Sequence, residues 1–291
     1  MLRDGRPYEC AGRIDWHLAA ADLGGSGKPL SGQGDASREW ADALVTDTTL
    51  DAFLGGRVLL RQPRVGYRAA TDAVFLAAAC PARARESVLD LGLGVGAAAL
   101  CLLARVPGAE VTGLELQPDY ADLARTNAKR AGAALDVMLG NAADLPDCLR
   151  ERSFDHVITN PPFFEGGAGM PSEDPGRDTA FREAMTLARW LDVAQRRLRP
   201  CGSLTVVHRT ERLAEILLAL APRCGGVRIT PLQSRLGQPA KRVVVRANKG
   251  SRAPLVLDAP FTIHAAMRHE GDFEDLSEAA LGILRHGHVL N

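Results

Sequence analysis

Short apolar segments of two kinds alternate along most of this chain, and this alternation restricts the possible folds more than any other feature. Brief segments rich in β-branched residues indicate strands, while longer apolar segments bounded by Pro or Gly indicate helices. The expected strands span 87–91, 110–116, 135–139, 154–159, 203–207, 227–232 and 242–247. The expected helices span 69–79, 97–106, 118–130, 179–198 and 211–220.

Strands that alternate with helices specify a parallel sheet that is covered on both faces. The last two expected strands are joined by a loop that contains Gly237 and Pro239. That loop is too short for a helical crossover, so these two strands should form an antiparallel hairpin. The sequence therefore predicts an α/β fold with a mostly parallel, seven-stranded sheet, a C-terminal antiparallel hairpin and helices on both faces.

Composition divides the chain into three parts. Residues 1–47 contain a glycine-rich stretch with little to bury, so we expect a disordered extension there. The alternating pattern occupies 48–257, and the acidic segment 258–291 should pack on that domain or trail from it. Lys and Arg together number 35, as do Asp and Glu, yet the region 216–257 is basic and contains no acidic residue. Such a block indicates either an anion-binding surface or an ordinary solvated face.

Several classes of protein are disfavoured by the composition. The six cysteines and seven histidines are scattered, without the paired spacing of a zinc site or a disulfide framework. The N-terminus lacks the apolar core of a secretory signal, and no run approaches the roughly 20 apolar residues of a membrane span. We therefore expect a cytoplasmic protein with no metal and no membrane partner.

A glycine-rich turn follows the first expected strand, with Gly92, Gly94 and Gly96 placed directly after Asp90. Glycine lets the backbone turn tightly and approach a ligand closely, although such turns can also be purely structural. Glu115 ends the second strand, where a carboxylate can accept hydrogen bonds from both ribose hydroxyls of an adenosine. A solvated strand end is the alternative interpretation of Glu115.

A third candidate element, Asn141 and Ala142, follows the third strand. Either the side chain of Asn141 or the backbone amide of Ala142 could contact the adenine of a nucleotide. Capping of the following turn by Asn141 explains the residue equally well. Because ligands of open α/β sheets bind at the carboxyl ends of the strands, all these elements should line one site.

The fourth expected strand ends in Asn160-Pro161-Pro162-Phe163-Phe164. The side-chain oxygen of Asn160 and the carbonyl of Pro161 can accept the two hydrogens of a planar –NH₂ group. Phe163 offers a face on which a base can stack, worth roughly 1–3 kcal/mol. No strong base is needed if the methyl donor is already activated, because positioning supplies much of the rate. The pattern predicts methyl transfer to an exocyclic amino nitrogen.

These motifs together resemble those of the class I amino-methyltransferases. With the stretches 53–57, 61–68 and 71–74, the chain resembles the bacterial tRNA adenine-N6 methyltransferase family whose known member modifies a valine tRNA. The resemblance covers about 49–249. It implies a Rossmann-like class I methyltransferase fold for 48–257, S-adenosyl-L-methionine as the cofactor and a tRNA as the substrate.

The resemblance also implies roles for individual residues. Asn160, Pro161 and Phe163 would hold the adenine amine, while Thr71 and Asp72 would approach the methionine end of the cofactor. The full set of cofactor-binding candidates is Thr71, Asp72, Asp90, Gly92, Gly94, Gly96, Glu115, Leu116, Asn141 and Ala142. The N-terminal extension and the Gly- and Pro-rich stretch 165–177 depart from the family's pattern, and the latter could form a substrate lid.

Other functions remain open from the sequence. Similar motifs serve enzymes that methylate a protein glutamine or the guanine N2 amine, although the glutamine enzymes carry a helical domain before the catalytic half. A non-catalytic cofactor- or RNA-binding module is a further alternative, against which the intact motif argues. For an RNA substrate, phosphates could explain two arginine clusters, or these could be surface charges: Arg57, Arg61, Arg64 and Arg68, and Arg189, Arg196, Arg197 and Arg199.

Among these residues we take five as substrate-binding candidates: Phe163, Phe164, Arg61, Arg64 and Arg68. The favoured interpretation is a monomeric enzyme that methylates adenine N6 in a tRNA.

Overall fold

The computed structural model describes residues 47–162, 185–266 and 275–290. Asp47–Asn291 forms one compact unit. Met1–Thr46 does not belong to this unit and lies outside the described residues. Phe163, Phe164 and the stretch 165–177 also lie outside them, as does the start of the helix expected at 179.

An antiparallel hairpin that the sequence did not predict begins the described chain. It consists of β1 (Thr48–Phe53) and β2 (Val58–Pro63), joined by the 3-10 turn η1 (Leu54–Gly56). Leu54 and Gly55 both adopt positive φ in this turn, which lets the chain reverse within three residues. The hairpin matters for the site because the segment after Pro63 leads across the sheet edge into the first helix.

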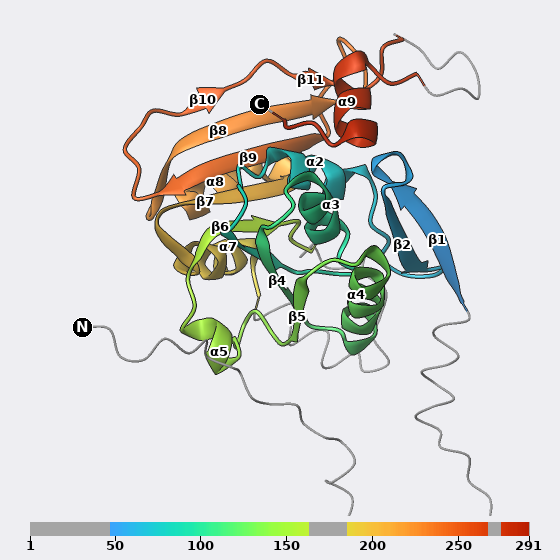
Figure 1. The fold of residues 1–291 in the computed structure, drawn as a ribbon. Helices are drawn as coiled ribbons and strands as arrows, with labels where there is room; N and C mark the ends of the chain where they lie inside the picture. The colour runs from blue at the N-terminus through green and yellow to red at the C-terminus, as the bar shows by residue number, and fades with distance from the viewer. Residues whose placement is uncertain (1–46, 163–184, 267–274, 291) are drawn as a thin grey trace, which may run out of the picture. The chain divides into compact units, whose positions relative to one another are not determined.

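The second sheet contains nine strands among the described residues, two more than expected. Its order is β10-β8-β9-β7-β6-β3-β4-β5, with β11 also paired to β8. Figure 1 shows this sheet running from β5 through β4, β6 and β7 to β9 and β8. The seven expected strands are β3 (Ser87–Leu91), β4 (Glu110–Glu115), β5 (Leu135–Leu139), β6 (Phe154–Thr159), β7 (Leu198–Arg209), β8 (Cys224–Gln233) and β9 (Arg242–Lys249).

Pairing in the sheet is parallel from β5 to β7, and β9 then lies antiparallel to both β7 and β8, so the predicted C-terminal hairpin is confirmed. The count of seven strands was wrong. β10 (Val256–Leu257) and β11 (Phe261–Thr262) add to the free edge of β8 as parallel strands. Each has only two residues, too few to show the period-2 pattern of a strand.

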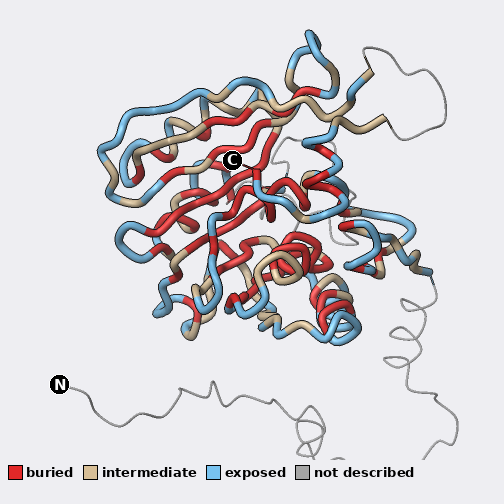
Figure 2. The backbone as a smooth tube through the Cα atoms, turned by 45° about the horizontal axis from the view of Figure 1, so that its top comes forward, coloured by how far each residue is buried: buried red, intermediate tan, exposed pale blue. Residues whose placement is uncertain are grey.

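Helices cover both faces, as predicted. They are α2 (Thr71–Ala79), α3 (Ala97–Arg105), α4 (Pro118–Ala131), α5 (Asp147–Arg150), α7 (Leu187–Arg196), α8 (Leu213–Leu220), α9 (Glu278–His286) and the 3-10 turn η2 (Thr210–Arg212). One buried cluster joins α2, α3, α4 and α9 to one face of the sheet, and a second joins α7 and α8 to the other. Successive strand residues alternate between them: Val88 faces the first cluster and Leu89 the second. Figure 2 shows the buried strands in the middle of this sandwich.

Two boundaries differ from expectation for local reasons. Helix α7 begins at Leu187, where the Thr186 side chain caps it by accepting a hydrogen bond from the Arg189 N–H at 3.2 Å, while positions 179–184 of the expected helix lie outside the described residues. Strand β7 begins at Leu198 and runs through the Pro and Gly that were expected only to end the helix. Cys201, at φ +64°, accommodates an irregularity in the register with β6.

The C-terminal segment packs on the α/β unit. Ile283, Leu284 and Leu290 belong to the same buried cluster as α2 and α3, and the Leu290 N–H donates to the Ala78 carbonyl at 3.0 Å. The Arg57 guanidinium donates to carbonyls at the ends of α3 and α9, and Figure 1 shows α9 beside α2.

Acidic residues of the C-terminal segment pair with the basic region before it. Asp258 bonds to Arg228 at 2.9 Å, and Asp275 bonds to Arg235 at 2.6 Å in an almost buried ion pair. The charge asymmetry seen in the sequence is therefore partly neutralised within the fold.

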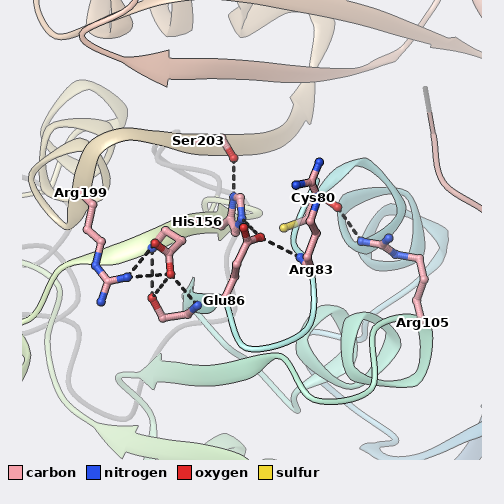
Figure 3. A network of polar contacts seen from close by, with 9 residues as sticks. Cys80, Arg83, Glu86, Arg105, His156, Arg199 and Ser203 are labelled. Carbon is pink, nitrogen blue, oxygen red and sulfur yellow. Dashed lines mark hydrogen bonds and ion pairs between the residues drawn. The ribbon is translucent and has the colours of Figure 1, made fainter.

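A polar network joins β3, β6 and β7 at the amino edge of the sheet (Figure 3). His156 lies between Ser203 (Nδ1···Oγ 2.7 Å) and Glu86 (Nε2···Oε2 2.9 Å). The hydrogen bond from His156 lowers the pKa of Glu86. Burial opposes ionisation of Asp155, but the hydrogen bonds from Ser87 and the ion pair with Arg199 lower the pKa of Asp155 to about 2. This network secures strand order at the edge opposite the predicted site.

Candidate active site

The glycine turn after β3 adopts backbone conformations that L-residues rarely take. Gly92, Gly94 and Gly96 have φ values of +82°, +57° and +87°. The Gly92 and Leu93 N–H groups both donate to the Leu114 carbonyl, at 3.0 and 2.9 Å, so the turn is tied to the end of β4. A Cβ at Gly92 would lie 3.0 Å from Trp190 Cζ2, so the turn also packs tightly on α7. Glycine permits both the positive φ values of this turn and, at Gly92, the close approach to α7.

Two carboxylates lie beside this turn. Glu115 accepts from the Gly94 N–H at 2.7 Å and the Gln117 N–H at 2.9 Å, and burial raises its pKa. Asp90 is 2% exposed; its burial, with the charge of Glu115 adding to it, raises the pKa of Asp90 well above the usual range. The Asp90 Oδ2 atom lacks a hydrogen-bond partner among the described residues. Leu116, directly after Glu115, is 42% exposed at the same edge.

The turn after β5 uses the side chain of Asn141 locally. Its Oδ1 accepts from the Ala143 N–H at 2.8 Å, and its carbonyl accepts from the Asp144 N–H at 3.1 Å. Asn141 therefore caps this turn, while α5 begins six residues later at Asp147. Its Nδ2 group keeps two further donors. Ala142 is buried and packs in the same cluster as Leu114.

Asn160 lies directly after β6, the neighbour of β3. Because Asp90 pairs with Ile158 in the β3–β6 register, Asn160 and the glycine turn come to the same sheet edge. The preceding residue, Thr159, is fully buried, donates to the Leu91 carbonyl at 2.7 Å and accepts from Trp190 Nε1 at 2.9 Å. One hydroxyl thus links the ends of β3 and β6 to α7. Asn160 is partly exposed, Pro161 is buried and Pro162 is exposed.

Tyr67 is a site residue that the sequence argument quoted within a motif but assigned no role. Its hydroxyl accepts a hydrogen bond from Asn160 Nδ2 at 3.4 Å. Its Cε1 lies 3.6 Å from the position that a Cβ on Gly94 would occupy, so the ring stands over the glycine turn. Burial of the hydroxyl and the nearby charges of Asp72 and Asp90 raise the pKa of Tyr67 to about 12, although half of the residue is exposed.

The loop that carries Tyr67 is held by two contacts. Gln62 is buried and exchanges hydrogen bonds with the Ala69 backbone, through Oε1 at 2.7 Å and Nε2 at 3.2 Å. The Tyr120 hydroxyl bonds to both the N–H and the carbonyl of Tyr67, at 2.9 and 3.2 Å. A polar residue at a buried strand position, such as Gln62, is the sequence signal that could have indicated this role.

Thr71 and Asp72 begin α2 after this loop. Thr71 is exposed, and Asp72 accepts a hydrogen bond from Arg242 Nε at 2.8 Å, which ties the start of α2 to the start of β9. The N-terminus of a helix attracts anions, and Asp72 in the first turn accords with the helix dipole.

The proposed substrate-binding arginines are largely engaged within the chain. Arg68 pairs with Asp51 at 2.5 Å and also donates to the Pro63 carbonyl, and Arg61 donates to Thr48 at 3.1 Å. Arg64 pairs with Asp47 on an exposed surface, where such a pair is worth little. The second cluster is engaged in the same way: Arg189 with Ala143, Arg196 with Asp192, Arg197 with Leu149 and Arg199 with Asp155. Phosphate contact by these arginines stays a prediction.

The chain is similar to known proteins in both sequence and fold. A family model described as the methyltransferase small domain matches residues 69–224, more than half of the chain. The chain belongs to the methyltransferase small domain family. The resemblance seen in the motifs is thereby confirmed.

Two relatives of this methyltransferase and one solved structure support the family assignment. The tRNA1(Val) (adenine(37)-N6)-methyltransferase of Porphyromonas gingivalis strain W83 is 30% identical over 67% of this chain and 79% of the relative. The protein of the same name from Glaesserella parasuis is 28% identical over 72% of this chain and 87% of the relative. A crystal structure of a predicted O-methyltransferase, Atu636 from Agrobacterium tumefaciens, has 27% identity and a TM-score of 0.59, covering 76% of this chain and 98% of that one.

The fold and family identify S-adenosyl-L-methionine as the cofactor. The sheet edge of this methyltransferase fits that molecule in three respects. Gly92 and Gly94 are partly exposed in the glycine turn, Glu115 offers carboxylate lone pairs beyond the two it uses, and Asp90 keeps one buried acceptor unpartnered among the described residues.

Residues 47–162, 185–266 and 275–290 lack two kinds of feature. No helix there combines the length and the apolar character that crossing a bilayer requires. In that part of the chain, no three His, Cys, Asp or Glu side chains lie close enough together to hold a metal ion.

Proposed function

We propose that this methyltransferase transfers a methyl group to the N6 amine of an adenine in a tRNA. The observation that carries the proposal is the placement of Asn160 at the end of β6, beside the glycine turn of β3, with its Nδ2 bonded to Tyr67. Since Nδ2 donates to Tyr67, the amide has a defined orientation that leaves Oδ1 as an acceptor for the substrate.

The proposed chemistry needs two acceptors on one –NH₂ group. Asn160 Oδ1 and the Pro161 carbonyl would each accept one of its hydrogens, which turns the nitrogen lone pair out of that grip and toward the glycine turn. The cofactor supplies an activated methyl group on a sulfonium. The nitrogen–carbon bond forms as the carbon–sulfur bond breaks, and one nitrogen proton then leaves to solvent. Positioning of the amine is the main contribution of the protein.

Cofactor binding is assigned to the same sheet edge, on the side of the glycine turn that faces β4 and away from β6. We propose that Glu115 accepts from the ribose hydroxyls, while the backbone at Gly92 and Gly94 allows close approach. We propose that Asn141 and Ala142 contact the adenine, and that Thr71 and Asp72 approach the methionine end. The burial that raises the pKa of Glu115 is offset in part by two backbone N–H donors, which favour the ionised form needed for this contact.

Support for a tRNA substrate comes from the names of the relatives, which methylate adenine 37 of a valine tRNA by name. An anticodon-loop base is already partly unstacked, which lowers the cost of bringing it to Asn160. We therefore propose a cytoplasmic enzyme acting as a monomer on tRNA. Protein glutamine and guanine N2 remain competing acceptors, since each also presents a planar amine.

The substrate is tested with labelled cofactor. Incubating the protein with total RNA and total protein from a strain that lacks it should transfer label to tRNA, and nucleoside analysis should show N6-methyladenosine. Label that appears only in protein would establish the glutamine alternative, and label in N2-methylguanosine would establish the guanine alternative. Methyl groups recovered on oxygen would contradict the amine mechanism altogether.

The role of Asn160 is tested by Asn160→Ala. We expect turnover to fall at least about a hundredfold, because the amine loses its defined orientation, while cofactor affinity stays within about twofold. Asn248→Ala is the matched control, since Asn248 is an exposed asparagine at the opposite end of the sheet, paired with Ser203. Unchanged turnover in Asn160→Ala would remove the residue from the mechanism.

A further inference from the structure

A groove of about 560 Å³ opens next to the candidate active site. It lies between the turn that follows β7 and the start of β9, and its lining is Arg209, Thr210, Glu211, Ala240, Lys241 and Arg242. The Thr210 N–H donates to the Lys241 carbonyl at 3.2 Å, so the two sides are joined at the base. Lys241 and Arg242 belong to the basic region 216–257, for which the sequence left an anion-binding surface open, whereas Arg209, Thr210 and Glu211 lie outside that region.

The position of the groove relative to Asn160 follows from the strand register. Thr159 pairs with Val206, and β7 continues for three more residues to Arg209, beyond the level at which β6 ends. Neighbouring strands are about 5 Å apart. Arg209, on the strand next to β6, therefore lies about one strand spacing to the side of Asn160. Arg242, on the strand after that, lies about two strand spacings to the side. In Figure 1, β6, β7 and β9 lie side by side in this order. The groove therefore flanks the catalytic edge.

Positive charge converges in the groove through strand pairing. Arg209 lies directly opposite Arg242 in the antiparallel β7–β9 ladder, and directly opposed like charges are unfavourable unless counter-charges relieve them. Glu211 lies 3.2 Å from Arg209, and Asp72 lies 2.8 Å from Arg242. Lys241, next to Arg242, is exposed, and adds a third cation.

The positive charge of the groove also affects a buried histidine on β7, next to Arg209. His208 is 2% exposed and its Nδ1 accepts from the Arg209 N–H at 2.8 Å. Burial, followed by the charges of Arg212 and Arg242, lowers the pKa of His208 to about 4. The ring stays neutral near pH 7, so the cations above it carry the charge of the groove. Thr210 adds a buried hydroxyl that lacks a hydrogen-bond partner among the described residues.

We propose that this groove binds backbone phosphates of the RNA strand next to the target adenine, chiefly through Arg209 and Lys241. The inference rests on the proposed function and names the surface that holds its substrate. Guanidinium and ammonium groups that share one face suit successive phosphates, and the groove lies one to two strand spacings from the amine-binding residue.

The test uses the full-length protein and an in vitro transcribed valine tRNA. In Arg209→Gln/Lys241→Gln, the plot of log Kd against log salt should become shallower by about 1.5, because two phosphate contacts are lost at about 0.7–0.9 each. The KM for tRNA should rise at least about tenfold at low salt, with kcat at saturating tRNA and cofactor Kd close to wild type. Arg242 is left intact because it holds Asp72.

A matched control removes two charges at the other edge of the sheet. Lys129 and Arg130 are exposed at the end of α4, and Lys129→Gln/Arg130→Gln should leave the salt slope and the KM unchanged. Glu211→Gln provides a gain-of-function arm, since it removes the carboxylate that neutralises Arg209. It should tighten tRNA binding at low salt, a result that misfolding could not produce.

The outcomes separate the two proposals. If the wild type methylates tRNA but the groove variants show wild-type salt slope and KM, the groove assignment is wrong and the proposed function stands. If the wild type neither binds nor methylates tRNA, both fall. Displacement of tRNA by polyglutamate but not by inorganic phosphate at equal ionic strength would assign the groove to an acidic peptide and overturn its assignment to RNA.

Discussion

At the scale of single residues, the proposed mechanism depends on the orientation of one amide. Asn160 would grip an amine only with its oxygen toward the substrate, and the hydrogen bond from Nδ2 to the Tyr67 hydroxyl favours that orientation. Tyr67 is itself anchored through its backbone by Tyr120. Because its pKa is raised to about 12, its hydroxyl remains protonated across the range in which enzymes of this kind work.

Tyr67→Phe tests this positioning role. We expect kcat to fall about fivefold, since one hydrogen bond of about 1 kcal/mol no longer orients the amide, while the ring and cofactor affinity are retained. The wild-type kcat should show no tyrosine ionisation below about pH 10. A fall in kcat matched by an equal loss of cofactor binding would indicate general damage to the site, and an unchanged kcat would exclude the role.

At the scale of elements, a buried hydroxyl holds the catalytic edge together. Thr159 connects the ends of β3 and β6 to α7 through hydrogen bonds of 2.7 and 2.9 Å. Removing it would leave the Leu91 carbonyl and the Trp190 indole N–H buried without those partners. The cost of leaving a buried polar group unpaired exceeds the modest gain of forming the bond.

Thr159→Val should lower the free energy of unfolding by about 2–4 kcal/mol, because two buried groups lose their hydrogen bonds to the Thr159 hydroxyl. Thr205→Val is the matched control on the adjacent strand, because Thr205 is equally buried and its Oγ1 lacks a hydrogen-bond partner among the described residues. That control should be close to neutral or slightly stabilising. Urea denaturation measures both, and equal losses in the two variants would contradict the linking role of Thr159.

At the scale of the whole molecule, the two ends of the chain should behave in opposite ways. Asp47–Asn291 forms a compact unit of its own, and its C-terminal residues Ile283, Leu284 and Leu290 are part of its core. Burial of such side chains contributes about 1.5–3 kcal/mol each, so their sum is comparable with the net stability of an ordinary domain.

Deletion of 258–291 should therefore abolish cooperative unfolding or reduce Tm severely, whereas deletion of 1–46 should leave Tm and cofactor affinity close to wild type. Differential scanning calorimetry and cofactor titration on the two truncated proteins provide the comparison. A stable protein that ends at Leu257 would show that α9 is dispensable. Loss of folding on removing 1–46 would refute the expected independence of that extension.

Much of the fold was predictable because its signals are local. The bounds of β3, β5 and β6 agree with expectation, since short apolar runs end there at turns. The hairpin β1–β2 was missed, because its strands are half-exposed and joined by a turn that combines Leu54 with two glycines. β10 and β11 were missed because a strand of two residues is too short to show the alternation of apolar and polar residues.

The candidate site was predictable to the extent that it lies at strand ends. Asp90, Glu115 and Asn160 were proposed from their positions at or near the ends of strands, and the parallel pairing of β3 with β4 and β6 brings them to one edge. Tyr67 and Arg209 could not be assigned in this way. Each reaches the site through a loop or a cross-strand pair whose partner is distant in the chain, which no local pattern encodes.

The sequence by itself determined the order of strands and helices, the edge that carries the site and the family, because periodicity and turn chemistry act over a few residues. Only the tertiary structure decided which charges are available. Arg228, Arg235 and Arg242 are neutralised by acids 30, 40 and 170 residues away, as strand register and crossover connections bring them together. Long-range pairing depends on packing of the whole chain, so the same basic region yields both internal ion pairs and the groove beside Asn160.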